Sequence, residues 1–260
     1  RDRIADLLSI EEEKVEYNLM QSVSSINRVE KNGKIFLETS KSMERDKKIK
    51  VELERIIKKF SYKKRDKKNH KDKTLRQTKS INFSEEQLEA INRSISSPIS
   101  IITGGPGSGK TTLLQGLIKN LKSEGFRIKL CAPTGRATKR IAEIPGAKSL
   151  KPSTIHSYLY SKENFQSKKI DTFIIDESSM IDIDLLLELL EAIPDKAQII
   201  FIGDADQLPP VGVGQPFKDL INAETIKVSR LTGNFRQQKV SEIATAAKNV
   251  IRGKLPKLVQ

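Results

Sequence analysis

The stretch Gly104-Gly105-Pro106-Gly107-Ser108-Gly109-Lys110-Thr111 follows an apolar run, residues 99–103, and opens a helical pattern, residues 111–118. In this context, glycines let consecutive backbone N–H groups turn inward around the phosphates of a nucleotide. Lys110 adds positive charge at the β- and γ-phosphates, and the Thr111 hydroxyl suits Mg²⁺. The stretch therefore predicts a nucleoside triphosphate site between a strand and a helix. The alternative, a glycine-rich turn without a ligand, does not account for the strand and helix on either side.

From Ile81 onward, short apolar runs alternate with amphipathic stretches, which predicts an α/β fold with a parallel sheet and flanking helices. Each of the first four predicted strands runs into a polar or glycine-rich turn. Open α/β sheets bind ligands at these carboxyl ends. The predicted strands are Ile99–Thr103, Ile128–Ala132, Thr172–Asp176, Ile199–Gly203 and Thr225–Leu231.

The first third of the chain predicts a small, mainly helical piece. Apolar residues recur at helical spacing in residues 9–29 and 42–60, and residues 34–37 are typical of a strand. Residues 61–80 are charged and lack periodicity, which indicates a linker. The predicted division is residues 1–62 for the accessory piece, 63–80 for a basic linker and 81–235 for the nucleotide-binding domain.

The net charge of +14 is concentrated in one segment. Residues 41–80 hold 17 Lys and Arg against 6 Asp and Glu, whereas the rest of the chain is close to balanced. This segment is either a solvated linker or a contact with a phosphate backbone. It has no aromatic residue between Tyr62 and Phe83, so it lacks the stacking surface of a dedicated single-strand binder.

Composition excludes several classes of protein. Cys131 is the single cysteine, so no intramolecular disulfide can form, and its apolar setting favours a buried thiol. No apolar run approaches the roughly 18 residues of a membrane span. We therefore expect no membrane association and a reducing, cytoplasmic location. The first residue is Arg1 rather than Met, which is typical of a processed or excised piece.

Two acids, Asp176 and Glu177, end the third predicted strand. A carboxylate beside a phosphate-binding loop can complete the coordination of Mg²⁺, and a second one can orient and deprotonate the attacking water. We assign Asp176 to magnesium and Glu177 to general-base catalysis. An acid pair at a helix N-terminus is the alternative.

The fourth predicted strand leads into a loop, residues 203–214, with prolines and glycines that exclude a helix or a central strand. This loop places Gln207 on a stiff turn near the expected γ-phosphate position. We predict that Gln207 senses the γ-phosphate, and the alternative is a plain surface loop.

Hydroxyl groups and an arginine at two predicted helix starts, residues 132–138 and 152–158, suit sequence-independent contacts with a nucleic-acid backbone. The alternatives are a solvated helix residue for Arg136 and a capping or surface group for His156. Upstream, Gln87 has capping-box spacing to Ser84, and its amide could equally pair with an adenine edge.

Six segments in this order resemble the motor motifs of superfamily 1 helicases of the RecD type, the family of the exodeoxyribonuclease V alpha subunit. They are GGPGSGKT at residues 104–111, APTGRAT at 132–138, TIHSYL at 154–159, IIDESSM at 174–180, GDADQLPPVGVG at 203–214 and LTGNFRQQ at 231–238.

The resemblance implies a RecA-like P-loop NTPase domain and an ATP-driven motor that moves 5′ to 3′ on single-stranded DNA, alone or with other exodeoxyribonuclease V subunits. It makes Gln87 the adenine reader, Arg236 a cation that reaches the γ-phosphate, and residues 236–260 the start of a second motor domain. The implied DNA contacts are Pro133, Thr134, Arg136, Thr154 and His156. The implied nucleotide-binding residues are Gln87, Gly104, Gly105, Pro106, Gly107, Ser108, Gly109, Lys110, Thr111 and Thr112.

The sequence departs from the family pattern in two places. The later motifs of a second motor domain are absent, so we expect nucleotide binding but slow hydrolysis from this chain. Only residues 159–169 separate the TIHSY segment from the next strand, so a strand-splitting hairpin there would be very short. Two other classes stay open, a P-loop enzyme acting on a small molecule and an architectural DNA-binding subunit.

Overall fold

The computed structural model describes residues 26–31, 34–60, 83–161 and 169–233. The chain divides into two compact units, residues 1–52 and 53–260. The three predicted domain boundaries, after residues 62, 80 and 235, lie outside the described residues and stay predictions.

The first unit contains an antiparallel strand pair, β1 (Ile26–Lys31) and β2 (Lys34–Thr39), in which Ile26 pairs with Thr39 and Lys31 with Lys34. The strand predicted at residues 34–37 is confirmed. The helix predicted over residues 9–29 is wrong for residues 26–29, which belong to β1, and its remainder lies outside the described residues. Asn32-Gly33 between the strands is the sequence signal of a two-residue hairpin turn, and it indicates pairing rather than a helix.

The helix α3 (Ser40–Lys59) confirms the helix predicted at residues 42–60. Its C-terminal part belongs to the second unit, where Arg55 donates hydrogen bonds to the carbonyl oxygens of Leu190 and Ile193, at 2.8 and 3.0 Å. Arg55 and Lys59 also bind the two carboxylate oxygens of Asp195, each at 2.6 Å. These two cations hold the pKa of Asp195 below its usual value.

The second unit is built on a six-stranded sheet in the order β5-β4-β6-β7-β3-β8, and all of its pairings are parallel. Five of the strands match the predicted ones to within two residues at each end. The edge strand β5 has only two residues and was not predicted. The strands are β3 (Ile99–Gly104), β4 (Ile128–Ala132), β5 (Ser153–Thr154), β6 (Thr172–Ile175), β7 (Gln198–Gly203) and β8 (Lys227–Leu231).

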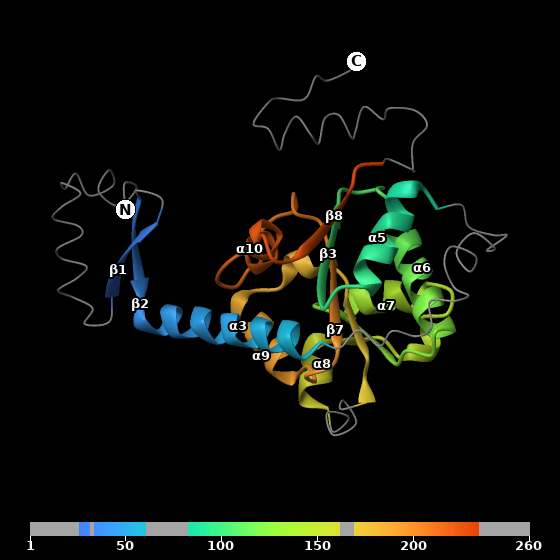
Figure 1. Ribbon diagram of the computed structural model, residues 1–260, viewed down its shortest axis with the longest axis horizontal. Helices are drawn as coiled ribbons and strands as arrows, with labels where there is room; N and C mark the ends of the chain where they lie inside the picture. Colours follow the sequence, from blue (N-terminus) through green and yellow to red (C-terminus); the bar gives the residue numbers. More distant parts are fainter. Residues whose placement is uncertain (1–25, 32–33, 61–82, 162–168, 234–260) are drawn as a thin grey trace, which may run out of the picture. The chain divides into compact units, whose positions relative to one another are not determined.

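Helices cover both faces of this sheet, as predicted (Figure 1). One face carries α5 (Glu85–Ile95), α6 (Lys110–Ser123) and α7 (Gly135–Glu143). The other carries α8 (Ile155–Tyr160) and α9 (Ile183–Ala192), and the short helix α10 (Pro216–Asn222) follows β7 in sequence. On the second face, the ring of Tyr158 meets that of Phe173 edge to face, with ring centres 5.4 Å apart.

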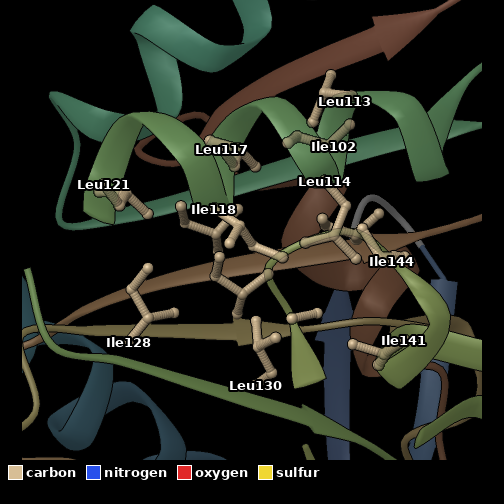
Figure 2. Packing of buried hydrophobic residues seen from close by; sticks show 14 of the residues in the cluster. Ile102, Leu113, Leu114, Leu117, Ile118, Leu121, Ile128, Leu130, Ile141 and Ile144 are labelled. Carbon is tan, nitrogen blue, oxygen red and sulfur yellow. The ribbon is translucent and has the colours of Figure 1, made fainter. Parts of the chain in front are cut away.

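The α6 helix shows why this layering forms. Its buried residues recur every three or four positions, so one stripe faces the sheet (Figure 2). Burying one such side chain stabilises the fold by about 1.5–3 kcal/mol. A side chain at Gly116 would meet Ile91 and Phe83 at 2.8 Å, so glycine permits the close approach of α5 to α6. The stripe consists of Leu113, Leu114, Leu117, Ile118 and Leu121.

Candidate active site

The predicted chemical groups meet at one edge of the sheet because β6, β7 and β3 are parallel neighbours. Their carboxyl ends lead into the Asp176-Glu177 pair, the loop with Gln207 and the glycine-rich loop, respectively. A hydrogen bond of 3.1 Å from the backbone N–H of Ala205 to the Thr103 hydroxyl ties the last two together. The structure therefore brings these groups together at the carboxyl ends of the strands, as the sequence indicated.

The glycine-rich loop has the backbone that a phosphate cradle requires. Gly107 and Gly109 have φ of 81° and 86°, in the region that favours glycine. Lys110 folds over the loop and donates hydrogen bonds to the carbonyl oxygens of Gly104 and Gly105. A side chain at Gly104 would approach the Ser108 hydroxyl to 2.6 Å and the Leu231 carbonyl oxygen to 2.9 Å. The loop therefore packs tightly against the end of β8.

The start of α6 fits a phosphate group. Gly109 occupies the N-cap position, so no side chain caps the first backbone N–H groups of this helix. Backbone N–H groups at a helix start favour a bound anion. The Ser108 hydroxyl is buried and has no hydrogen-bond partner among the described residues. Both groups suit the oxygens of a nucleotide phosphate.

Gln87 is 2% exposed and both ends of its amide are engaged. Its Oε1 accepts from the Ser84 N–H at 3.0 Å, and Ser84 Oγ accepts from the Gln87 N–H at 3.2 Å. The predicted capping box is thus confirmed. The amide Nε2 also donates to the Gly109 carbonyl at 3.3 Å, which links α5 directly to the glycine-rich loop. Adenine recognition by Gln87 stays a prediction.

Asp176 follows the last residue of β6 and is half-buried. Its N–H donates to the Cys131 carbonyl on β4, and its Oδ1 accepts from the Glu177 N–H, both at 2.9 Å. Burial raises the pKa of Asp176 to about 6, and the N–H of Glu177 and the charge of Lys110 oppose this shift. A bound cation would favour the ionised carboxylate in the same way.

Glu177 has a left-handed backbone, with φ 52° and ψ 39°. Such a conformation is costly for a residue other than glycine and persists where the surroundings impose it. Here the 3₁₀ turn η3 (Ser178–Met180) follows immediately, and the Ser178 hydroxyl donates to the Ile175 carbonyl at 2.8 Å. The turn holds Glu177 next to Asp176 at the strand end. Its role as the base stays a prediction.

The loop after β7 is anchored at several points, which agrees with the predicted stiff turn. The N–H of Gln207 donates to the Asp204 carbonyl at 3.3 Å, and that of Asp206 donates to Asp204 Oδ1 at 3.0 Å. Further along, the Val213 carbonyl accepts from the N–H of Ile183 at the start of α9, at 3.0 Å. The Ser179 hydroxyl donates to Gln207 Oε1 at 3.1 Å.

The candidate DNA contacts gather at the neighbouring part of the same edge, because β4 pairs with β5 and aligns Ala132 with Thr154. The side chains of Thr134 and Thr154 cap α7 and α8 by accepting backbone N–H groups at 3.2 and 3.0 Å. Arg136 and His156, in the first turns of these helices, are exposed, and Pro133 is half-buried. The structure thus brings all five together. DNA contact by them stays a prediction.

Sequence reasoning missed three polar residues near the site. Thr103 and Ser179 hold the Gln207 loop, and the charge of Arg140 on α7 acts on Asp176. A polar residue at the end of a buried strand, as in Thr103, is a usable signal. The predicted site residue Arg236 lies outside the described residues.

Thr111 is exposed and Thr112 half-buried in the first turn of α6. Within the described residues, no group of three or more His, Cys, Asp or Glu could hold a metal ion. None of the described helices is long and apolar enough to cross a membrane.

A model of the AAA domain family matches residues 82–260. This chain belongs to the AAA domain family. The match begins just before α5 and includes every strand of the six-stranded sheet.

The AAA domain is also similar to helicases of known families. The chain is 36% identical over 180 residues to the ATP-dependent RecD2 DNA helicase of Deinococcus radiodurans. This alignment covers 67% of this chain and 24% of that protein. The chain is also 43% identical over 140 residues to the RecBCD enzyme subunit RecD of Buchnera aphidicola, covering 44% of this chain and 23% of that protein. These relatives confirm the RecD-type resemblance, and the chain spans about a quarter of their length.

The solved structure of the Pif1 helicase from Candida albicans is 26% identical, with a TM-score of 0.52. The likeness covers 68% of this chain and 46% of that chain. It confirms the predicted RecA-like fold of a superfamily 1 motor domain.

Proposed function

We propose that this AAA domain is the first motor domain of a RecD-type DNA helicase, which couples ATP hydrolysis to 5′-to-3′ movement on single-stranded DNA. The observation that carries the proposal is the meeting of the glycine-rich loop, the Asp176-Glu177 pair and the Gln207 loop at the ends of three neighbouring parallel strands. A phosphate cradle, two carboxylates and an amide are the groups that nucleoside triphosphate hydrolysis uses.

In the proposed nucleotide complex, the β- and γ-phosphates lie on the backbone N–H groups at the start of α6. Lys110 exchanges its hydrogen bonds to the loop carbonyls for the phosphate oxygens. Gln87 keeps the loop in place through Gly109, and the second hydrogen of its Nε2 and the second lone pair of its Oε1 pair with the adenine edge. Thr111 and Asp176 would hold Mg²⁺, which supplies positive charge to the phosphate oxygens.

Hydrolysis then requires a base and contacts with the leaving phosphoryl group. Glu177 accepts a proton from the attacking water as its oxygen bonds to the γ-phosphorus. The bond from that phosphorus to the bridging oxygen breaks, which gives ADP and phosphate. Gln207 and Arg236 contact the γ-phosphate and stabilise its charge. Since Glu177 adjoins the 3₁₀ turn that binds Gln207, the base and the sensor share one support.

Single-stranded DNA is the proposed partner of the edge formed by β4 and β5. Arg136 and His156 are exposed there, so their side chains can contact phosphate groups. We place the biological role in repair or recombination of double-strand breaks, either alone or with other exodeoxyribonuclease V subunits. The relatives named above motivate this role.

The decisive experiment measures ATP hydrolysis by the full-length protein with and without single-stranded DNA, followed by unwinding of duplexes with a 5′ or a 3′ tail. We expect DNA to stimulate hydrolysis and only the 5′-tailed duplex to unwind. An equal rate of ATP hydrolysis with and without single-stranded DNA would contradict a motor function. Unwinding of the 3′-tailed duplex alone would leave the motor but reverse its proposed direction.

A further inference from the structure

We propose that Ser179 is a positioning residue that holds the Gln207 amide by its oxygen, with the amide N–H groups left for the nucleotide. The inference rests on the proposed role of Gln207 as the γ-phosphate sensor and names the group that makes this role possible. The hydrogen bond from Ser179 Oγ to Gln207 Oε1, at 3.1 Å, carries it.

An amide has two unlike ends, and only one suits a phosphate. The oxygen Oε1 accepts hydrogen bonds, whereas Nε2 donates them, and phosphate oxygens accept. If Oε1 faced the γ-phosphate, two negative ends would meet. In the observed arrangement the Ser179 hydroxyl donates to Oε1, which leaves the N–H groups of Nε2 available for a phosphate oxygen.

Ser179 is suited to this task because its own position is fixed. It is 7% exposed and lies in the 3₁₀ turn that follows Glu177. A side chain at Gly203 would approach the Ser179 nitrogen to 3.0 Å and the ring of Phe217 to 2.9 Å, so the end of β7 packs directly on this turn. Little room is left for the turn to shift without moving the strand.

The backbone of Gln207 is fixed independently of Ser179. The Gln207 loop is tied to Thr103 on β3 through Ala205, and the Asp204 carbonyl accepts from the Gln207 N–H. The side chain of Gln207, by contrast, is exposed, and Ser179 is the side-chain partner that orients it. Loss of the Ser179 hydroxyl should therefore free the amide to rotate while the loop stays in place.

The test is a double-mutant cycle on the full-length protein, with the rate of ATP hydrolysis measured at saturating ATP and single-stranded DNA. Ser179→Ala should lower kcat by about two- to tenfold, the effect of one neutral hydrogen bond. In a Gln207→Ala background the same change should lower kcat by less than about twofold, because the amide it orients is gone. Thermal unfolding of each variant shows that it is folded.

Ser178→Ala is the matched control, since its hydroxyl binds the Ile175 carbonyl in the same turn and does not contact Gln207. Its effect should be the same in both backgrounds. Gln207→Glu keeps an acceptor for Ser179 but lacks the N–H donors, so it should hydrolyse ATP no faster than Gln207→Ala. This variant tests whether position 207 needs an N–H donor, even if Ser179→Ala does not fold.

An equal loss of kcat from Ser179→Ala with and without Gln207 would overturn the inference and leave Ser179 a structural residue. So would a Gln207→Glu protein as fast as the parent. A parent without ATP hydrolysis would contradict the proposed function itself. If the parent hydrolyses ATP and Gln207→Ala matches it, only the sensor role of Gln207 fails, together with the inference.

Discussion

At the ends of β3, β6 and β7, several polar side chains of the proposed nucleotide site are held by partners within the chain. Gln87, Lys110 and Gln207 each form side-chain hydrogen bonds there. At the ends of β4 and β5, the two threonines cap helices, whereas Arg136 and His156 extend into solvent. The first region is organised in advance for a ligand of one shape. The exposed side chains of the second suit the proposed contact with a phosphate backbone, which requires no recognition of bases.

The largest effect is expected at the nucleotide edge, where two variants should separate binding from chemistry. Glu177→Gln should bind ATP normally and hydrolyse it about 10²- to 10⁴-fold more slowly, because the base is lost. Lys110→Ala should bind ATP poorly, since it removes a charge from the phosphates. Binding of a fluorescent ATP analogue and steady-state hydrolysis measure the two properties. Hydrolysis by Glu177→Gln at the parent rate would disprove the assignment of the base.

DNA binding at the ends of β4 and β5 should depend on salt concentration and not on base sequence. We expect affinity for single-stranded oligonucleotides to fall about tenfold or more between 50 and 200 mM salt. Oligonucleotides of equal length and different sequence should bind alike at fixed salt, because the proposed contacts reach phosphates. Fluorescence anisotropy measures both. A steep preference for one sequence would contradict the proposal that the ends of β4 and β5 contact phosphates without recognising bases.

Substitution of Thr134 or Thr154 should lower the free energy of unfolding, whereas substitution of the exposed Arg136 should leave it nearly unchanged. Thr134→Ala and Thr154→Ala each remove a helix cap, so each should lower the free energy of unfolding by about 1 kcal/mol. Arg136→Ala should change it by less than about 0.5 kcal/mol and weaken DNA binding instead. Denaturant unfolding and DNA titrations on the same variants test this. If Arg136→Ala left DNA binding unchanged at low salt, Arg136 would be the plain solvated residue of the alternative interpretation.

The smallest effect concerns Cys131, which lies on β4 and pairs with Ser153 of the two-residue strand β5. Burial raises the pKa of its thiol to about 11, so the thiol is almost entirely protonated at pH 8. Alkylation should therefore be slow in the folded chain and fast after denaturation. Thr154→Ala should speed it modestly by loosening β5 next to Ser153, whose hydroxyl lies 3.9 Å from Cys131 Sγ. Equal rates in both proteins would mean that the edge strand is not a weak point.

What the sequence predicted correctly depends on residues that are close together along the chain. The glycine-rich loop, the acids after Ile175 and the capping box at Ser84 each act within a few residues, so spacing alone reveals them. Strand existence followed from short apolar runs, because a strand covered on both faces has few polar positions.

Contacts between distant parts of the chain could not be predicted in this way. Ser179 and Gln207 are 28 residues apart, and Arg55 and Asp195 are 140 apart. No periodicity encodes such pairs, since they depend on strand order and on the path of each loop. Strand β5 is too short to leave a pattern. The β1–β2 pair is different, because Asn32-Gly33 offered a local signal that the helical spacing of residues 9–29 outweighed.

The hydrogen bonds of Arg55 affect where the chain can be truncated without loss of stability. A chain shortened to begin at residue 81, the predicted start of the nucleotide-binding domain, would lack both Arg55 and Lys59. The carbonyl oxygens of Leu190 and Ile193, at the end of α9, would lose their guanidinium donor, and Asp195 would lose both cations. At its other end, α9 begins beside the Gln207 loop through Ile183 and Val213. An excised domain that keeps residues 53–60 should therefore tolerate heating better than one that begins at residue 81.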